Sequence, residues 1–368
     1  MESWKMKYRR WLFVLLWIHI FLLFILGSVW WSKGNLDPVS TFSKKEVITT
    51  SSMESLKGKK IIAGGNPVGI YIETEGALVL GTQSVKSVDG SLHEPAKYIV
   101  KEGDYIVKAN GVEIHNKEEL TEIVKKQGNS SMILEIIRKN KRVSVKIEPV
   151  KSKENGEYQL GIWVRDNSQG IGTMTYIYED KFGALGHGIH DIDTGGMMDV
   201  KGGYIFDSKI LSVKKGAKGK PGEMIGMVCY DFKNPYGTIE KNTDYGIYGK
   251  VKPALTNQLE GKEVTIGGKD EVKKGKAYIR SAISGTMEEY EIKITDVDAS
   301  NKSLEKGMII EITDKRLLEL TNGIVQGMSG TPILQDGKLV GAVTHVFVQD
   351  STKGYGTFIE NMLKESNS

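Results

Sequence analysis

The chain has few of the residues that build disulfide or metal scaffolds. Its 368 residues include a single cysteine, Cys229, and only 8 prolines. One cysteine excludes an intrachain disulfide framework and a cysteine-based structural zinc site. The sequence also has neither a His-Glu-x-x-His motif nor a Gly-x-x-x-x-Gly-Lys-Ser/Thr loop. It therefore indicates no metal and no nucleotide cofactor.

Excess charge is scarce beyond the first ten residues. The formal net charge is +4, and residues 1–10 contribute +3 of it through four basic residues and one glutamate. The remaining 358 residues therefore sum to +1. Such a balance gives no support to nucleic-acid binding, which needs a strongly basic surface.

A long apolar run follows the basic tail. Residues 11–31 carry no formal charge, and a helix of this length spans the ~30 Å hydrocarbon core of a membrane. Trp11, Trp30 and Trp31 lie at its ends, as is typical of the membrane interface. A cleaved signal peptide is the alternative, but it has a shorter apolar stretch and a small-residue cleavage site. We expect a cytoplasmic tail (1–10), an uncleaved anchor (11–31) and an extracytoplasmic remainder.

A polar linker over residues 32–60 leads to a small module, placed at 61–150. In the module, Asn116 and Glu119 form a capping-box pattern, and the apolar spacing after them predicts a helix over 117–127. Apolar alternation and β-type composition predict strands at Ala77–Leu80, Tyr105–Ala109, Met132–Arg138 and Arg142–Glu148. This combination indicates a small open α+β barrel.

Two stretches of the module, residues 64–72 and 100–111, resemble a PDZ domain. In that family a glycine-containing loop presents backbone N–H groups to a peptide that adds as a β-strand. The resemblance places this loop at Val68, Gly69 and Ile70, which depart from the common Gly-Leu-Gly-Phe form. A structural glycine turn without a ligand is the alternative.

Residues 151–368 are rich in short β-type runs broken by glycine and lack alternating long helices. They predict a sandwich or a pair of barrels rather than a doubly wound sheet. The runs are Gly172–Tyr178, Ile205–Val213, Met224–Tyr230, Glu263–Ile266, Lys276–Ile283, Tyr290–Val297 and Met308–Ile312.

A serine in a glycine-flanked turn is the strongest chemical signal. Gly327-Met328-Ser329-Gly330 precedes a predicted hairpin, Thr331–Leu334 and Lys338–Val348, around an Asp-Gly turn. A nucleophile suits this position, and the N–H groups of Gly327 and Ser329 are candidates for an oxyanion hole. An ordinary turn is the alternative. The α/β-hydrolase elbow does not fit, because position 331 is threonine.

A histidine between glycines is the candidate base. His187 follows a predicted strand, and its neighbours Gly186 and Gly188 leave the imidazole accessible. Its titration near neutral pH suits general-base catalysis. His190, three residues on, is a rival.

Taken together, these motifs resemble a serine peptidase of the chymotrypsin-like superfamily. GIGTMTYIY, FGALGHGIHDIDTG, KGKPGEMIG and VQGMSGTPILQDGKLVGAVTHVF are most similar to the stage IV sporulation protein B peptidase family. The resemblance implies a mainly β chain with an N-terminal anchor, a PDZ domain and a double β-barrel peptidase domain at 151–368. It also implies the nucleophile Ser329, the base His187 and the acid Asp314. Asp231 and Asp191 remain the alternatives for the acid.

The resemblance further implies a role in sporulation. Such peptidases act between the two forespore membranes and cleave a regulator of an intramembrane metalloprotease, which leads to activation of a late sigma factor. They also cleave themselves near the N-terminus, and we expect that cut within the linker. A non-catalytic anchored PDZ scaffold is the alternative from another class, and an esterase is a third possibility.

Two further features lie near or within the peptidase motifs. Thr344 and His345 follow the nucleophile on the next strand, where the superfamily builds the pocket for the P1 side chain, so we expect one of them to select it. A hydrogen-bonded core histidine is the alternative. Lys214, Lys215, Lys218 and Lys220 form a basic loop, which is either a solvated turn or a surface for an acidic substrate.

Overall fold

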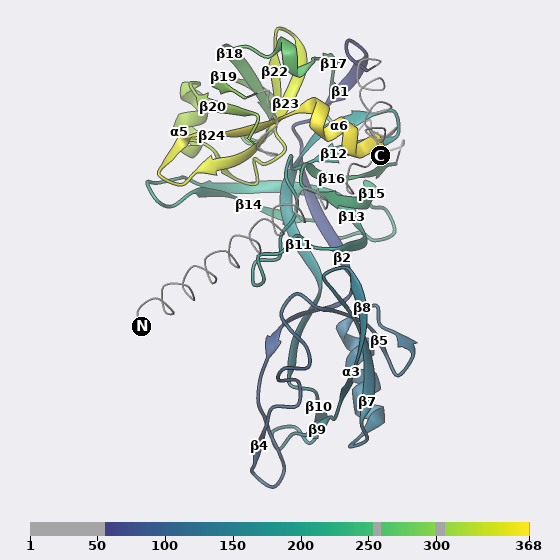
Figure 1. The fold of residues 1–368 in the computed structure, drawn as a ribbon. Helices are drawn as coiled ribbons and strands as arrows, with labels where there is room; N and C mark the ends of the chain where they lie inside the picture. The colour runs from purple at the N-terminus through teal and green to yellow at the C-terminus, as the bar shows by residue number, and fades with distance from the viewer. Residues whose placement is uncertain (1–55, 253–258, 299–305, 368) are drawn as a thin grey trace, which may run out of the picture. The chain divides into compact units, whose positions relative to one another are not determined.

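The computed structural model describes residues 56–252, 259–298 and 306–367, and strands dominate it (Figure 1). The prediction of a mainly β chain is confirmed. The predicted tail (1–10), the anchor (11–31) and the linker up to residue 55 lie outside the described residues. Within those residues, none of the helices has the length and apolar character that crossing a bilayer requires.

Six strands form a first closed barrel. Each pairs antiparallel with the next, and the last returns to the first. In pairing order they are β2 (Pro67–Thr82), β11 (Ile162–Tyr178), β12 (Lys181–Ala184), β16 (Gly246–Val251), β15 (Gly237–Thr243) and β13 (Val200–Lys214). Side chains from all six strands form the core, including the fully buried Val68, Ile72 and Phe182. Closure leaves each of these strands with a partner on both sides.

Six later strands form a second closed barrel. In pairing order they are β18 (Gly275–Ser281), β22 (Pro332–Gln335), β23 (Lys338–Phe347), β24 (Asp350–Phe358), β20 (Met308–Ile312) and β19 (Glu288–Val297). Two helices accompany this barrel, α5 (Lys315–Thr321) and α6 (Ile359–Asn367), as does a short 3-10 helix, Lys269–Glu271. Ile279, Ile310 and Ile333 are fully buried in its core.

Two ladders join the barrels. Strands β1 (Lys60–Ala63) and β17 (Lys262–Ile266) pair with each other, while β1 also pairs with β11 and β17 with β23. The second ladder pairs β14 (Gly222–Val228), the return strand of the β13 hairpin, with β21 (Val325–Gln326). Because β21 leads directly into Gly327, the second ladder reaches the predicted nucleophile turn.

The small module is inserted between β2 and β11 of the first barrel. Its core contains side chains from Ala77 to Val164. Its other elements are β3 (Val85–Lys86), β4 (Leu92–His93), β5 (Tyr105–Ala109), β6 (Val112–Glu113), α3 (Lys117–Gln127), β7 (Met132–Arg138), β8 (Lys141–Ile147), β9 (Val150–Lys151) and β10 (Tyr158–Gln159). The limits therefore differ from the expected 61–150, because β2 and β11 each run from the barrel into the module as one strand, with shifts in their pairing register near the junction.

The predicted peptide-binding loop is a strand of the barrel. Val68, Gly69 and Ile70 lie within β2, which pairs with β11 on one side and β13 on the other. All three residues are buried. Their backbone is therefore occupied by the sheet, and the expectation of a carboxylate-binding loop here is corrected.

The helix of the module begins as the sequence predicts. Asn116 caps α3, and its side-chain oxygen accepts a hydrogen bond from the N–H of Glu119 at 2.8 Å. The Glu119 carboxylate reaches back to the N–H of His115 rather than to that of Asn116. Leu120 and Val124 are buried against the module core.

A buried ion pair gives a test of the module. Asp104 is 1% exposed, and Arg138 binds both of its carboxylate oxygens, at 2.8 and 2.6 Å. Replacing Arg138 with methionine leaves this charge buried without its partner. We expect Arg138→Met to lower the free energy of unfolding by about 3–5 kcal/mol. Arg142→Met is the matched control, because Arg142 is exposed and its nearest carboxylate oxygen, on Glu135, is 3.9 Å away. Hydrogen exchange of the module amides measures the unfolding free energy of both variants. An equal loss of stability in the two variants would contradict the prediction.

Candidate active site

The nucleophile turn connects β21 and β22. Gly327 and Gly330 have φ angles of +97° and +93°, a region that favours glycine. A side chain at position 330 would place its Cβ atom 2.1 Å from the carbonyl oxygen of Thr173. The two glycines that flank Ser329 in the sequence are therefore required by backbone conformation, and Gly330 also by close packing.

Strand β11 of the first barrel holds this turn. Thr173 donates its hydroxyl to the carbonyl of Gly327 at 2.8 Å, and Thr175 donates to that of Gly330 at 2.7 Å. The N–H of Thr173 also donates to the carbonyl of Ser329 at 3.1 Å. These carbonyls point toward β11, so the turn is fixed from the opposite barrel.

Two N–H groups of the turn remain open. Met328, Gly330 and Thr331 each donate a backbone hydrogen bond within the second barrel. Across the part of the chain that the structure describes, the N–H groups of Gly327 and Ser329 have no such acceptor. They are thus available to bind the oxygen of a tetrahedral intermediate.

The candidate base follows β12 of the first barrel. The Nδ1 atom of His187 lies 2.8 Å from the carbonyl oxygen of Gly188. Since a carbonyl can only accept, Nδ1 carries the proton, and in neutral imidazole Nε2 is then the proton acceptor. This is the tautomer that a general base requires.

The loop after His187 is clamped by an amide that the sequence did not reveal. Asn242 on β15 accepts from the N–H of Ile189 at 2.8 Å and donates to the carbonyls of Ile189 and Met198, at 2.9 and 3.0 Å. The rival histidine, His190, is exposed, and its Nδ1 atom lies 3.2 Å from the same Gly188 carbonyl.

One pocket contains both candidate catalytic residues. It has a volume of about 420 Å³, and its lining includes His187, Gly327, Ser329 and His345. Residues 168–171 of β11 form another wall, which the sequence did not indicate. Ser329 and His187 therefore face the same space from different barrels.

The strand after the nucleophile contributes Thr344 and His345. The Ser329 hydroxyl donates to the carbonyl of Thr344 at 2.7 Å. The His345 ring packs against His187, with centroids 4.7 Å apart. Burial, followed by the neighbouring charge of His187, lowers the pKa of His345 to about 4. His345 is consequently neutral at physiological pH. The side chain of Thr344 is buried.

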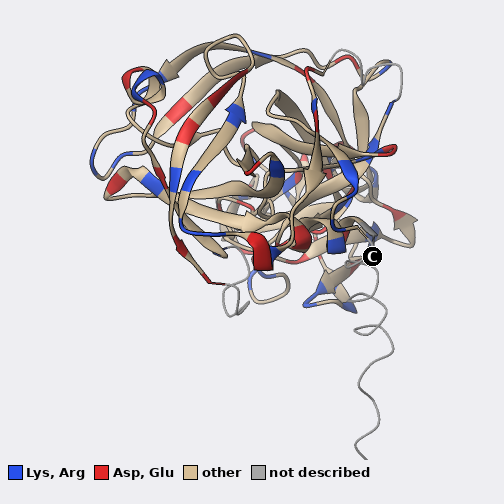
Figure 2. Ribbon diagram, turned by 90° about the horizontal axis from the view of Figure 1, so that it is seen from above, with Lys and Arg blue, Asp and Glu red and all other residues tan. Residues whose placement is uncertain are grey.

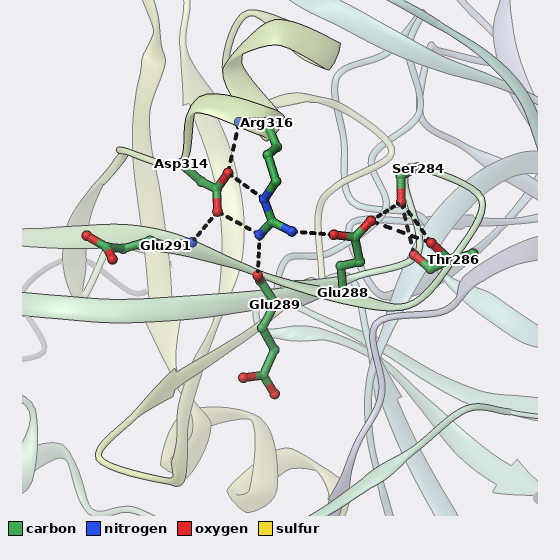
Figure 3. Close-up of polar contacts among 7 residues, drawn as sticks. All are labelled: Ser284, Thr286, Glu288, Glu289, Glu291, Asp314 and Arg316. Atoms are coloured by element: carbon green, nitrogen blue, oxygen red, sulfur yellow. Dashed lines mark hydrogen bonds and ion pairs between the residues drawn. The ribbon is translucent and has the colours of Figure 1, made fainter.

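The predicted acid lies elsewhere. Asp314 caps α5, and both of its carboxylate oxygens accept hydrogen bonds from Arg316, while Oδ2 also accepts from the N–H of Glu291 (Figure 3). Arg316 in turn binds Glu288. The hydrogen bonds from Arg316 lower the pKa of Asp314 to about 2 against the opposing effect of burial. Asp314 is absent from the pocket lining, so the structure does not bring it to His187.

The two alternative acids also have other partners. Asp231 is exposed and accepts from the side chain of Asn234. Asp191 is 2% exposed and pairs with Arg165 of β11, which also binds Asp193. Burial opposes ionisation of Asp191, but the N–H of Thr194 and the charge of Arg165 outweigh it and lower the pKa. Arg165 thus holds the histidine loop.

The family of the chain follows from a comparison with protein-family models. The model described as SpoIVB peptidase S55 matches residues 156–363, more than half of the chain. The chain belongs to this family. It is therefore a serine endopeptidase, and the resemblance inferred from the motifs is confirmed. Among curated proteins no relative matches this peptidase.

Solved structures give weaker likenesses. The PDZ domain of an SdrC-like protein from Listeria monocytogenes is 20% identical, with a TM-score of 0.20, and the match covers 24% of this chain and 87% of that one. The HtrA-type protease AlgW with a decapeptide is 12% identical, with a TM-score of 0.32, covering 55% and 54%. An inactive form of Rv3671c from Mycobacterium tuberculosis is 12% identical, with a TM-score of 0.28, covering 54% and 82%. At these values the likenesses add nothing to the family assignment.

The surroundings of Asp314 predict a role in stability. Its pKa in the folded chain lies below the ordinary 3.8, so it stabilises the fold above about pH 4 and loses that contribution as the pH falls toward 2. We expect Asp314→Asn to remove this part of the acid dependence of the unfolding midpoint. The variant should still react with a fluorophosphonate at Ser329, without the ~10⁴-fold loss that follows removal of a triad acid. Asp231→Asn is the control, and a loss of that size in Asp314→Asn alone would restore Asp314 as the acid.

The Arg165 contacts predict a positioning role. Arg165→Gln leaves the buried Asp191 carboxylate without its cation and loosens the loop that carries His187. Because small misplacements cost up to about 100-fold in rate, we expect slower fluorophosphonate labelling of Ser329. Adding Asp191→Asn should restore part of the rate, since a neutral residue needs no cation. Lys201→Gln, an exposed change on β13, should have no effect. An unchanged rate in Arg165→Gln would refute the role.

Proposed function

We propose that the two barrels form a chymotrypsin-like peptidase domain in which Ser329 is the nucleophile and His187 the general base. The observation that carries the proposal is their shared pocket, with the open N–H groups of Gly327 and Ser329 beside it. Ser329 exchanges its hydrogen bond to Thr344 for one to Nε2 of His187 as the substrate binds.

The reaction then follows the acyl-enzyme route. Ser329 Oγ attacks the scissile carbonyl while His187 takes its proton at Nε2, and the N–H groups of Gly327 and Ser329 bind the oxyanion. His187 returns the proton to the leaving amine. Water, activated by the same imidazole, hydrolyses the ester and regenerates Ser329.

In this proposal a backbone carbonyl orients the base. The Gly188 oxygen holds the proton on Nδ1 and so fixes the tautomer, which is one of the two tasks of a triad acid. A neutral carbonyl stabilises the imidazolium less than a carboxylate does. The neutral His345 ring beside His187 adds no positive charge that would oppose protonation of the base.

Thr344 and His345 are the proposed determinants of the P1 side chain. His345 lines the pocket, and the carbonyl of Thr344 binds the nucleophile. Their place on β23, directly beside Ser329, supports this assignment.

We further propose that the peptidase is membrane-anchored and acts in sporulation. The apolar segment 11–31 and its basic flank support the anchor. The family match supports the sporulation role, in which the substrates are the chain itself and an extracytoplasmic regulator of an intramembrane metalloprotease. The module between β2 and β11, with its PDZ-like sequence, is proposed to bind a peptide or protein segment at a site other than residues 68–70.

Self-cleavage tests this function. We expect the wild-type chain to lose its N-terminal segment by a cut within residues 32–60, whereas Ser329→Ala and His187→Ala keep full mass. The measurement is intact mass in the expressing cell. Ser284→Ala, at an exposed serine, is the matched control and should be cut normally. Equal masses for wild type and Ser329→Ala would overturn the proposal.

A further inference from the structure

The hairpin of β13 and β14 carries a basic surface that the peptidase site does not use. Its tip bears Lys214, Lys215, Lys218 and Lys220, all exposed. Residues 208–222 contain no acidic side chain, and Glu223 is the first one after the tip. Elsewhere basic and acidic residues are interspersed over the strands (Figure 2). The tip is therefore a local concentration of positive charge.

These four lysines lack carboxylate partners. In the described ranges, no acidic side chain lies within ion-pair distance of them, whereas Lys262, Lys276 and Lys338 each contact a glutamate at 2.6 Å. Their charge is thus not neutralised within the fold.

Large apolar side chains lie on the same hairpin. Leu211 is 66% exposed, Ile225 45% and Met227 52%. Ile225 is opposite Ser212, and Met227 is opposite Lys209, with Leu211 in the bulge between. Opposed residues of an antiparallel pair share a face, so one outer face presents Ile225 and Met227 together with Lys209, Lys214 and one acidic residue, Glu223, opposite Lys214.

The tip is held in place by its backbone. The N–H of Gly216 donates to the carbonyl of Thr321 at 2.9 Å, and the amide of Asn322 donates to the Gly216 carbonyl at 2.7 Å. The N–H of Gly219 donates to the carbonyl of Val348 at 2.9 Å. The lysines are consequently presented from a fixed loop.

We propose that this hairpin surface, formed by the four tip lysines with Leu211, Ile225 and Met227, docks on an anionic lipid bilayer. Lysine combined with exposed aliphatic side chains matches a membrane surface, where the charges bind anionic headgroups and the aliphatic groups enter the boundary with the acyl chains. Protein interfaces favour aromatic residues and arginine and are depleted in lysine. The inference rests on the membrane anchor proposed above for residues 11–31, which would keep the chain at a bilayer. An acidic protein is the competing occupant.

The native cysteine allows a direct test in the full chain. Cys229 is exposed and lies two residues after Met227. We label it with a polarity-sensitive fluorophore and reconstitute the chain in phosphatidylcholine vesicles or in equimolar phosphatidylcholine and phosphatidylglycerol, with a quencher on the lipid. We expect blue-shifted, quenched emission only with phosphatidylglycerol. It should be reversed in 1 M salt, where the Debye length is about 3 Å.

Two variants with equal charge change complete the experiment. K214Q/K215Q/K218Q/K220Q should lose the quenching, because each lysine near an anionic surface contributes about fivefold to association. K59Q/K86Q/K101Q/K139Q, at exposed lysines elsewhere, should keep it. The proposal is overturned if quenching is equal in neutral vesicles or survives in the first variant. A response to soluble polyglutamate without one to phosphatidylglycerol would also overturn it and assign the surface to an acidic protein.

Discussion

The hydrogen bonds from β11 to the nucleophile turn are the constraint on which the rest of the structure depends. Ser329 belongs to the second barrel and His187 to the first, so the proposed catalysis requires the two barrels to keep a fixed relative position. Thr173 and Thr175 provide this by binding the carbonyls of Gly327 and Gly330. The N–H groups of Gly327 and Ser329 belong to other peptide units of the same turn, and among the described residues they have no backbone acceptor. One strand thus fixes the turn that carries the serine.

The same strand connects the active site to the small module. β11 begins in the module core, carries Arg165 to the histidine loop, lines the pocket at residues 168–171 and ends beyond Thr175. The module also touches the end of that loop directly, because the hydroxyl of Tyr105 accepts from the N–H of Asp199 at 2.9 Å. The module therefore contacts the loop that carries His187 through Tyr105 and through β11, whose Arg165 pairs with Asp191.

Local sequence patterns are sufficient to predict many of the secondary-structure elements and the two candidate catalytic residues. The helix at 117–127, the strand at Met308–Ile312 and the glycine-flanked Ser329 and His187 depend on residues close together in the chain. A carboxylate partner for His187 cannot be predicted in this way, because such a contact joins residues that are far apart in the sequence. The available signal was that Asp314 directly precedes a helix, where aspartate is a common N-cap. Arg165 and Asn242 were missed since their partners lie tens of residues away. The insertion of the module was missed because β2 and β11 each run from the barrel into the module as a single strand.

In the proposed mechanism the backbone carbonyl of Gly188 sets the tautomer of the base, His187. Nitrogen-15 NMR of histidine-labelled protein tests it most directly, with the His187 signals assigned by their absence in His187→Gln. We expect neutral His187 to carry its proton on Nδ1, and its titration to be the same in wild type and Asp314→Asn. A proton on Nε2, or a titration that shifts when Asp314 is neutralised, would contradict it.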